Sequence, residues 1–402
     1  MAKTTPQSPV DFAQIIPREH TGCVKYDARR ERFGRADVHP LWVADMDFAA
    51  PDCVQRALAE RVAHPIYGYA IFPDAFFTTI QRWLSIRHGW VVARAAIVPL
   101  PGIVPALNLL VQALSQMGDG ILVQTPVYPP IHQLPLNHGR MLLENALIST
   151  PQGYEIDWSD FTTKVAQARL FILCSPHNPV GRVWRRDELE RMATLCLAHQ
   201  VIILVDEVHA DLVYAPHQHL SVASLSNEIS AQCITLNAPS KTFNIAGLNT
   251  AYAIIDNPNL RATLHTAVQH TGLGSGNVFG ITALIAAYQQ GAPWLNQLLH
   301  QLQQNRDFVV GYFTENDLGI TVVRPEATFL LWLDCRQLMQ RLHLSDDAAL
   351  ARFFIERAGL GLNPGISFGA PGSGFMRLNT GCPPSVLHTA LASLNHSISE
   401  DN

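Results

Sequence analysis

The sequence lacks the features that mark secreted, membrane-spanning or nucleic-acid-binding proteins. No apolar segment reaches the ~18 uninterrupted residues that a membrane span needs, and the opening MAKTTPQSPV lacks the charged-then-apolar pattern of a secretion signal. No run of five like charges occurs, and 33 acidic against 28 basic residues give a net charge of −5. We therefore expect a soluble, cytoplasmic protein with a small-molecule partner and with no nucleic-acid or membrane partner.

The spacing of the cysteines also gives no sign of disulfide pairing. The seven cysteines are an odd number, are widely spread and form no CxxC motif. Several lie in apolar runs, as Cys174 does at the end of residues 171–174. Such cysteines are typical of buried free thiols in a reducing compartment.

The hydrophobic pattern predicts an α/β fold. The sequence is 48% hydrophobic, which is enough for a large core. With 402 residues the chain is too long for one ordinary domain of ~100–200 residues. Short runs rich in Ile, Val and Leu alternate with longer amphipathic stretches, as buried parallel strands joined by helices do. The predicted strands are residues 95–99, 120–125, 170–175, 201–206, 233–237 and 250–255. Predicted helices cover 104–117 and 187–199, and Asp187 is suited to cap the second one.

The pattern changes after about residue 290, where a second, smaller domain is expected. It comprises a long amphipathic segment (293–313), a strand (327–334), a helix (346–358) ended by Gly359, and a segment rich in Gly and Pro (363–374). The last segment is either a surface connector or an active-site lid.

Four of the predicted strands end in polar motifs. Ligands of open α/β sheets gather at the carboxyl ends of the strands, so these motifs converge on one site if the strands are neighbours. They are TPVY (125–128), SPHNPVG (175–181), DEVH (206–209) and APSKTFN (238–244).

Each motif taken alone has an ordinary structural interpretation. A lysine after a strand is usually a solvated surface residue, an Asn between prolines usually forms a turn, and a Tyr near a Pro usually packs. Asp206, Glu207, His209 and Asp211 together also resemble a set of ligands for a divalent metal. Alternation argues against that set, because an extended chain points residues 206 and 207 to opposite faces, and we expect no metal.

Taken together, the motifs meet the demands of one cofactor, pyridoxal phosphate. It needs a lysine that carries it, a carboxylate at the pyridine nitrogen, a donor to the phenolate oxygen, an aromatic ring to stack on and amides for the phosphate. Lys241, Asp206, Asn178 and Tyr128 provide the first four. Gly102, Ile103 and Val104, where a strand turns into a helix, offer backbone N–H groups to the phosphate.

The chain resembles fold type I pyridoxal-phosphate enzymes of the aminotransferase superfamily, and more narrowly the cystathionine β-lyases of the MalY/PatB family. Six motifs in register carry the resemblance: WVADMDF (42–48), YGY (67–69), SPHNPVGRVW (175–184), DEVHAD (206–211), PSKTFNIAGL (239–248) and RLNTGCP (377–383). The resemblance implies a large domain (51–288) with a mainly parallel seven-stranded sheet flanked by helices. It also implies a smaller α+β domain (289–402), which an N-terminal segment (1–50) joins.

The resemblance also implies roles for single residues. Arg377 would bind the substrate α-carboxylate, a task that suits a guanidinium, with Asn178 and Ala44 assisting. Tyr69 would reach the phosphate of the partner subunit in a homodimer, while Tyr67 would contact either substrate or only its own chain. His209 and Ser240 would complete the cofactor site.

Three departures from related enzymes narrow the choice of activity. His209 stands where many aminotransferases have a Tyr, and Asn249 stands where they often have a phosphate-binding Arg. Both favour the lyase branch. Pro129 replaces a second Tyr that some lyases carry, so any catalytic help from that phenol is absent.

The predicted reaction is the β-elimination of an L-cysteine thioether such as L-cystathionine to a thiol, pyruvate and ammonia. Lys241 would remove the α-proton, and Lys241 or Tyr128 would protonate the leaving thiolate. An aminotransferase is the main alternative. A non-catalytic regulator is a weaker one, because the motifs begin at residue 42 and leave too little chain for a DNA-binding module before them.

Overall fold

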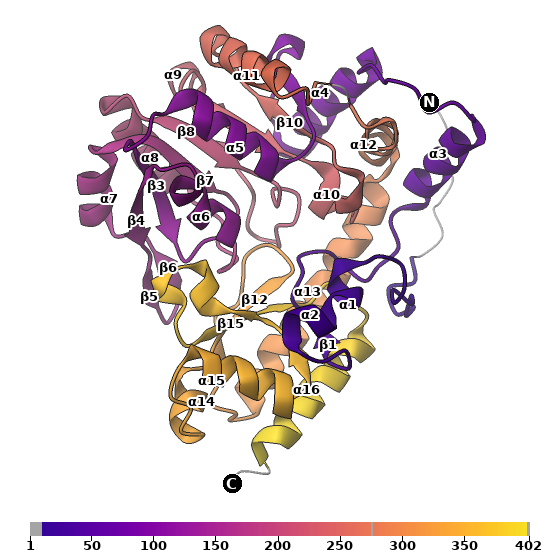
Figure 1. Cartoon of the computed structure of the whole chain (residues 1–402), viewed down its shortest axis with the longest axis vertical. Coiled ribbons are helices and arrows are strands. Elements are labelled where there is room, and N and C mark those ends of the chain that lie inside the picture. Colours follow the sequence, from indigo (N-terminus) through magenta and orange to yellow (C-terminus); the bar gives the residue numbers. More distant parts are fainter. Residues whose placement is uncertain (1–9, 275, 400–402) are drawn as a thin grey trace.

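The computed structural model describes residues 10–274 and 276–399, and one seven-stranded sheet forms its centre (Figure 1). In spatial order the strands are β2 (Ile97–Leu100), β10 (Ala251–Ile254), β9 (Cys233–Asn237), β8 (Ile202–Asp206), β7 (Ala168–Cys174), β3 (Gly120–Thr125) and β4 (Met141–Ala146). The five strands from β9 to β4 pair in parallel, whereas β10 is antiparallel to both of its neighbours. The predicted α/β class with a mainly parallel seven-stranded sheet is confirmed.

Helices cover both faces of this sheet, because successive side chains of its buried strands point to opposite faces. In β7, Leu170 and Ile172 belong to the core on one face, and Phe171 and Leu173 belong to the core on the other. The first core contains side chains of α5 (Ile103–Leu114), α6 (Pro129–Asn137) and α11 (Pro258–His270). The second contains side chains of α4 (Asp74–His88), α7 (Trp158–Val165), α8 (Arg186–Ala198) and α12 (Val278–Gln290).

A second sheet organises the C-terminal part of the chain. Its strand order is β11 (Thr321–Val322), β12 (Leu330–Asp334), β15 (Phe375–Asn379) and β14 (Asn363–Pro364). The helices of this part are α13 (Ala292–Glu315), α14 (Arg336–Arg341), α15 (Asp347–Arg352) and α16 (Pro384–Ser399), and they share a third apolar core with the sheet.

Residues 24–41 pack on this C-terminal part, as Figure 1 shows for α1 (Val24–Asp27) and α2 (Arg29–Phe33). The short strand β1 (His39–Pro40) pairs in parallel with β13 (Leu360–Gly361), and Leu41 enters the third core. The division into an N-terminal segment (1–50) and two domains with a limit at residue 288 stays a prediction.

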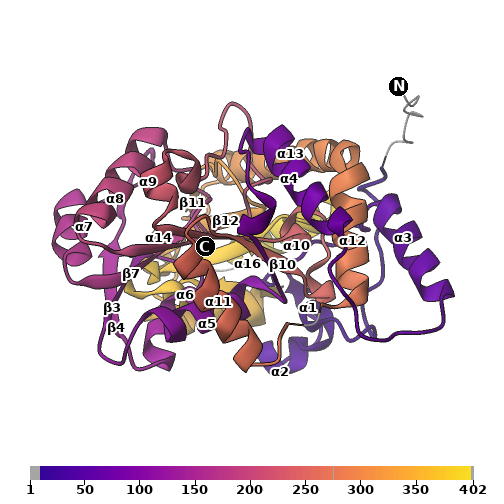
Figure 2. The ribbon, with the colours of Figure 1, turned by 90° about the horizontal axis from the view of Figure 1, so that it is seen from above.

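The remaining elements lie around the large sheet. In Figure 2, α3 (Asp52–Ala63) lies beside α12, at the opposite end of the molecule from α7. The hairpin of β5 (Ile148–Thr150) and β6 (Gly153–Glu155), α9 (Asn227–Ser230) and α10 (Pro239–Thr242) connect the larger elements. No helix in the described ranges combines the length and the apolar character needed to cross a membrane.

Three details differ from the predictions. Strand β4 was not predicted, because it is an edge strand whose run MLLENA contains Glu and Asn. Asp187 does not cap α8: it lies in the first turn, and Glu188 instead accepts a bond from the N–H of Arg185 (2.9 Å). The predicted helix 346–358 is α-helical only in α15 and continues as a wider π turn, 353–357, before Gly359.

Candidate active site

The four polar motifs meet at one end of the large sheet, since β3, β7, β8 and β9 are neighbours. The residues after these strands line a cavity of about 330 Å³. Its walls include ten of the residues predicted from sequence: Ala44, Gly102, Ile103, Val104, Tyr128, Asn178, Asp206, His209, Ser240 and Lys241. The expected convergence is confirmed.

Lys241 lies in the single-turn helix α10, which begins at Pro239 directly after β9. Its Nζ donates a hydrogen bond to the carbonyl oxygen of Ala44 (2.6 Å). Burial lowers the pKa of Lys241 to about 8, against an ordinary value of 10.5. This amine therefore exchanges a proton much closer to neutral pH than an exposed lysine does.

Asp206 ends β8 and is 5% exposed. Its Oδ1 accepts a bond from the N–H of Val208 (3.1 Å), and it forms no ion pair with any residue that the structure describes. Burial raises its pKa to about 6. Lys241 lines the same cavity but forms no ion pair with Asp206, so this buried carboxylate is suited to a cationic ligand such as a protonated ring nitrogen.

Tyr128 and Asn178 join the ends of β3 and β7. The N–H of Tyr128 donates to the carbonyl oxygen of Asn178 (3.1 Å). Burial raises the pKa of the Tyr128 phenol, so it keeps its proton at neutral pH. The Asn178 side chain points toward β15, where its Oδ1 accepts a bond from Arg377 (3.1 Å).

Arg377 is a buried cation held only by neutral acceptors. Besides Asn178, its guanidinium donates to the carbonyl oxygen of Trp42 (2.9 Å) and to Oδ1 of Asn363 (3.1 Å), while its Nε has no partner. No carboxylate of the described chain pairs with it, and burial lowers its pKa to about 10. The arrangement leaves this charge available to a carboxylate of a ligand.

The N-terminus of α5 provides a site for an anion. Gly102 is its N-cap residue, no side chain caps the helix, and Gly102, Ile103 and Val104 line the cavity. The free N–H groups and the helix dipole at this end favour negative charge, as a phosphate group carries it.

Ala44 lines the cavity and belongs to the segment 42–48, which forms no helix or strand. Side chains hold its backbone: Asn379 donates to the carbonyl oxygens of Val43 (2.5 Å) and Asp45 (2.7 Å). Asn244 binds both the N–H and the carbonyl oxygen of Met46 (2.9 and 2.8 Å).

Buried and partly buried ion pairs hold the same segment from the N-terminal side. Lys25 is completely buried and pairs with Asp47 (2.9 Å), and Arg18 pairs with Asp45 (2.7 Å) and Asp47 (2.6 Å). Sequence analysis missed Arg18, Lys25, Asn244 and Asn379. The two asparagines lie in motifs that carried the resemblance, which was the available signal, whereas nothing distinguished Arg18 or Lys25 from surface residues.

His209 is buried, and its Nδ1 has no hydrogen-bond partner. Burial lowers its pKa to about 3, so the ring is neutral. The alternative metal set around it does not assemble: Glu207 faces His219 (3.2 Å), and Asp211 is bound by Thr242 and His88 (both 2.9 Å). The described ranges contain no group of three or more His, Cys, Asp or Glu arranged to hold a metal.

Tyr67 and Tyr69 do not line this cavity. Tyr67 donates to the carbonyl oxygen of Val62 (2.9 Å) and packs on Phe279 (ring centroids 5.7 Å apart). Tyr69 is completely exposed. Their predicted roles toward substrate and partner subunit stay predictions.

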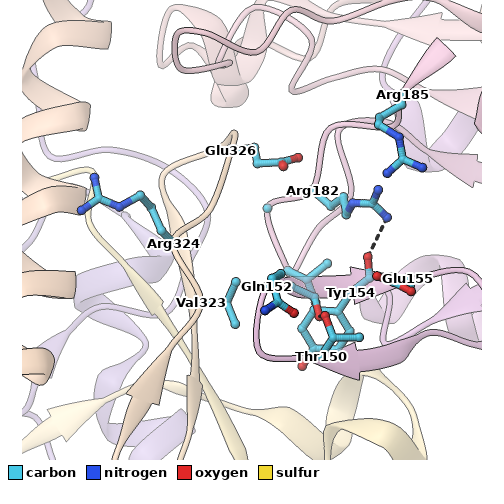
Figure 3. A pocket seen from close by; sticks show the side chains of 12 residues that line it. Thr150, Gln152, Tyr154, Glu155, Arg182, Arg185, Val323, Arg324 and Glu326 are labelled. Carbon is cyan, nitrogen blue, oxygen red and sulfur yellow. Dashed lines mark hydrogen bonds between the residues drawn. The ribbon is translucent and has the colours of Figure 1, made fainter.

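A second crevice, of about 170 Å³, separates the β5–β6 hairpin from the segment before β12 (Figure 3). Arg182 donates to the carbonyl oxygen of Tyr154 (2.6 Å), while Arg324 extends away from it. Arg182 pairs with Glu188, Arg185 with Asp187, and Arg324 with Asp307. Because its arginines are already paired within the chain, we assign this crevice no ligand.

Comparison with known proteins agrees with the resemblance seen in the sequence. The profile of the family "Aminotransferase class I and II" matches residues 37–394. The chain is 39% identical to "Cystathionine beta-lyase PatB" of Bacillus subtilis, over 97% of this chain and all of that one. It is 35% identical to "Protein MalY" of Escherichia coli, over 96% and 98% of the two chains.

Solved structures give the same result. Cystalysin from Treponema denticola, whose structure contains a pyridoxal 5′-phosphate cofactor, superposes with a TM-score of 0.92 at 30% identity, over 97% of this chain and 99% of that one. The pyridoxal-phosphate-bound C–S lyase from Staphylococcus hominis superposes with a TM-score of 0.90 at 29% identity, over the same shares. The chain therefore belongs to the class I and II aminotransferase family, and within it to the branch of the PatB and MalY proteins.

Proposed function

We propose that this chain is a pyridoxal-5′-phosphate-dependent carbon–sulfur β-lyase that cleaves L-cystathionine or a related L-cysteine S-conjugate. The observation that carries the proposal is the cavity itself. It combines a lysine of lowered pKa with an unpaired buried carboxylate and a helix N-terminus, beside a buried arginine that lacks an anionic partner. Its relatives carry the names cystathionine β-lyase and C–S lyase.

The residues present fit the cofactor. Lys241 would carry it, Asp206 would pair with its ring nitrogen, Asn178 would donate to its phenolate oxygen, and Tyr128 would stack on its ring. The N-terminus of α5, Ser240 and His209 line the same cavity and would complete the site. When bound, the cofactor supplies an electron sink for the α-carbon of the substrate.

The substrate would be oriented by Arg377, whose planar guanidinium can bind both oxygens of an α-carboxylate. Asn178 already contacts this guanidinium, and Ala44 faces the lysine, so both would adjoin the same carboxylate. Tyr67 would take part only if the exposed 66–71 segment moves or meets a partner.

The neutral Nζ of Lys241 would then remove the α-proton, as its lowered pKa permits near neutral pH. Cleavage of the Cβ–S bond releases a thiolate, which takes a proton from Nζ of Lys241 or from Oη of Tyr128. The remaining three-carbon enamine is hydrolysed to pyruvate and ammonia. The raised pKa of Tyr128 keeps its phenol protonated and available for this step.

Assembly as a homodimer in the cytoplasm belongs to the same proposal. Ile66, Tyr67, Tyr69 and Ile71 all expose half or more of their side chains within one short segment. An apolar surface of this kind suits burial against a second copy, in which Tyr69 would reach the partner's phosphate site. All seven cysteines are unpaired, which suits a reducing compartment.

The deciding experiment incubates the purified enzyme, loaded with pyridoxal phosphate, with L-cystathionine and follows pyruvate and free thiol. We expect both products in equal amounts. Turnover of an amino acid with 2-oxoglutarate, without pyruvate from cystathionine, would instead identify an aminotransferase. A panel with L-cystine and S-alkyl-L-cysteines then ranks the substrates.

The shared site is tested by mixing two inactive variants. Subunits that carry Lys241→Ala and subunits that carry Tyr69→Ala are unfolded together and refolded. Hybrid dimers would contain one site with both residues intact, so partial recovery of activity is expected. If activity stays at the level of the separate variants, Tyr69 does not act across an interface.

A further inference from the structure

A buried carboxylate lies behind the active-site cavity without lining it. Asp211 is 4% exposed and accepts bonds from three side chains. Thr242 Oγ1 donates to Oδ2 (2.9 Å), His88 Nε2 lies 2.9 Å from Oδ1, and Trp83 Nε1 lies 3.2 Å from each oxygen. No role assigned above uses this residue, although it ends the motif DEVHAD.

Asp211 is joined to the turn that presents Asp206. In this turn the N–H of Ala210 donates to the carbonyl oxygen of Glu207, and the N–H of Leu212 donates to that of His209 (both 2.9 Å). These bonds fold residues 206–212 into one compact unit. A displacement of Asp211 would therefore also displace Asp206 and His209.

Thr242, on the other side of the contact, directly follows Lys241 in α10. This helix has only four residues, and so short a helix is not stable by itself. Tertiary contacts must therefore fix its position, and the bond from Thr242 to Asp211 is a direct side-chain tie between α10 and the turn after β8.

The charge of Asp211 is maintained although the side chain is buried. Burial alone would raise its pKa, but the hydrogen bond and charge of His88, the charge of Arg87 (3.8 Å) and the bond from Thr242 hold it below the usual value. Tyr252 of β10 and Tyr288 of α12 also interact electrostatically with Asp211, whose charge raises their pKa values. A hydrogen bond to a charged acceptor is stronger than one between neutral groups, so we expect a strong hydrogen bond from Thr242 to Asp211.

We propose that Asp211, acting through Thr242, is a positioning residue that fixes Lys241 relative to Asp206. The inference rests on the proposed function, in which Lys241 carries the cofactor and Asp206 pairs with its ring nitrogen. These two groups must meet opposite ends of one rigid ring. A tie between the two segments that carry them sets that spacing in advance.

The test uses the holoenzyme and the variant Thr242→Val, which replaces the hydroxyl by a methyl of similar size. Two properties are measured. The first is the rate at which the cofactor is released into cofactor-free buffer, and the second is the pH midpoint of the visible absorbance of the lysine-bound cofactor. We expect release to accelerate about tenfold, the size of one hydrogen bond to a charged group, and the midpoint to shift. Thr242→Ser, which keeps the hydroxyl, should restore both properties to within about twofold of the wild type.

Trp83→Phe is the matched control, because it removes a different donor to the same carboxylate and leaves the bond to Thr242 intact. It should lower the melting temperature without changing the release rate or the midpoint. Asp211→Asn, which places an amide N–H₂ group among three donors, should act in the same direction as Thr242→Val.

Two results would overturn the inference: Thr242→Val with wild-type release and midpoint, or Trp83→Phe with the same shifts as Thr242→Val. If Thr242→Val does not fold, Asp211→Asn takes its place under the same criteria. A wild-type protein that develops no visible absorbance with pyridoxal phosphate would instead contradict the proposed function. The two failures are therefore distinguishable.

Discussion

The active-site cavity has two walls that are built in different ways. On one wall, four residues stand at or just after the ends of neighbouring strands of the large sheet: Asp206, Asn178, Tyr128 and Lys241. The backbone hydrogen bonds between these strands fix the positions of the strand ends. The opposite wall consists of residues 42–48, of which Ala44 lines the cavity. There the backbone forms no ladder, and individual side chains bind its carbonyl groups one by one.

This difference predicts how each wall responds to substitution. Replacing a residue of the strand-end wall should remove chemistry while the wall itself stays in place, since main-chain bonds hold it. A single substitution on the opposite wall should displace the wall, because each side chain there holds part of the backbone. Activity and stability should therefore separate on the first wall and fall together on the second.

The largest effect is expected for Lys241→Ala. The variant loses both the amine that holds the cofactor and the base for the α-proton, so pyruvate formation should fall by about 10⁴-fold or more. The melting temperature of the cofactor-free protein should change little, because the lysine is not part of a ladder. The measurement is pyruvate release at saturating cystathionine. More than a hundredth of wild-type activity would contradict the assignment of Lys241.

Arg377→Lys tests the substrate carboxylate site. A lysine keeps the positive charge but loses the planar fork that binds two carboxylate oxygens. We expect kcat/KM for cystathionine to fall about 10²- to 10³-fold, mainly through KM, as for other buried charged contacts. The exposed Arg185→Lys is the matched control and should behave as wild type. A changed kcat with unchanged KM would show that Arg377 acts on another step.

The same contrast explains what the sequence could predict. Four strand ends could be located because apolar runs mark the strands and the polar motifs follow them directly. Neighbouring strands then placed Lys241 and Asp206 together. The antiparallel direction of β10 and the existence of β4 could not be read in this way, since periodicity reports burial and not pairing direction.

The opposite wall was predicted only where a motif carried the resemblance. Arg377 and Ala44 were found by this route, but the residues that hold their surroundings were not. Lys25 is completely buried beside Asp47, 22 positions along the chain, and no periodic signal marks such a contact. Long-range polar contacts depend on how separate segments pack, which local sequence patterns do not record.

The pH dependence of stability sharpens the comparison, because Asp206 is a buried carboxylate that lacks a cationic partner in the cofactor-free protein. Its pKa is about 6 when folded and 3.8 ordinarily, so between these pH values the folded chain retains a proton that the unfolded chain releases. The free energy of unfolding should therefore fall as pH rises from about 4 to 6, by about 3 kcal/mol from this group.

Urea unfolding of cofactor-free wild type and Asp206→Asn at pH 4, 5, 6 and 7 measures this contribution. The variant should gain stability relative to wild type as pH rises, and the difference should level off above pH 6. Parallel curves for the two proteins would mean that burial does not raise the pKa of Asp206. Adding pyridoxal phosphate should reverse the difference at pH 7, because only the wild type offers the cofactor ring a carboxylate.

Asn379→Ala should show the smallest effect on turnover and the clearest coupling of activity to stability. Its Nδ2 group binds the carbonyl oxygens of Val43 and Asp45, on either side of the carbonyl that faces Lys241. Its loss leaves the carbonyl oxygen of Val43 without a donor and leaves that of Asp45 with Lys25 alone (3.4 Å). It also removes the acceptor of the N–H of Gly381 (2.7 Å), and together these losses should cost about 1–3 kcal/mol in the free energy of unfolding. We also expect kcat/KM to fall about tenfold, because residues 42–48 no longer hold their place beside Arg377.

The control for this variant is Thr235→Val on the large sheet, where the hydroxyl is buried without a partner. This substitution removes a polar atom from β9, the strand that precedes Lys241, and we expect activity to stay at the wild-type level. If Asn379→Ala loses stability while its kcat/KM stays unchanged, the backbone of residues 42–48 does not depend on that side chain for its position. The two walls would then respond to substitution alike, and the difference expected from their backbones would be contradicted.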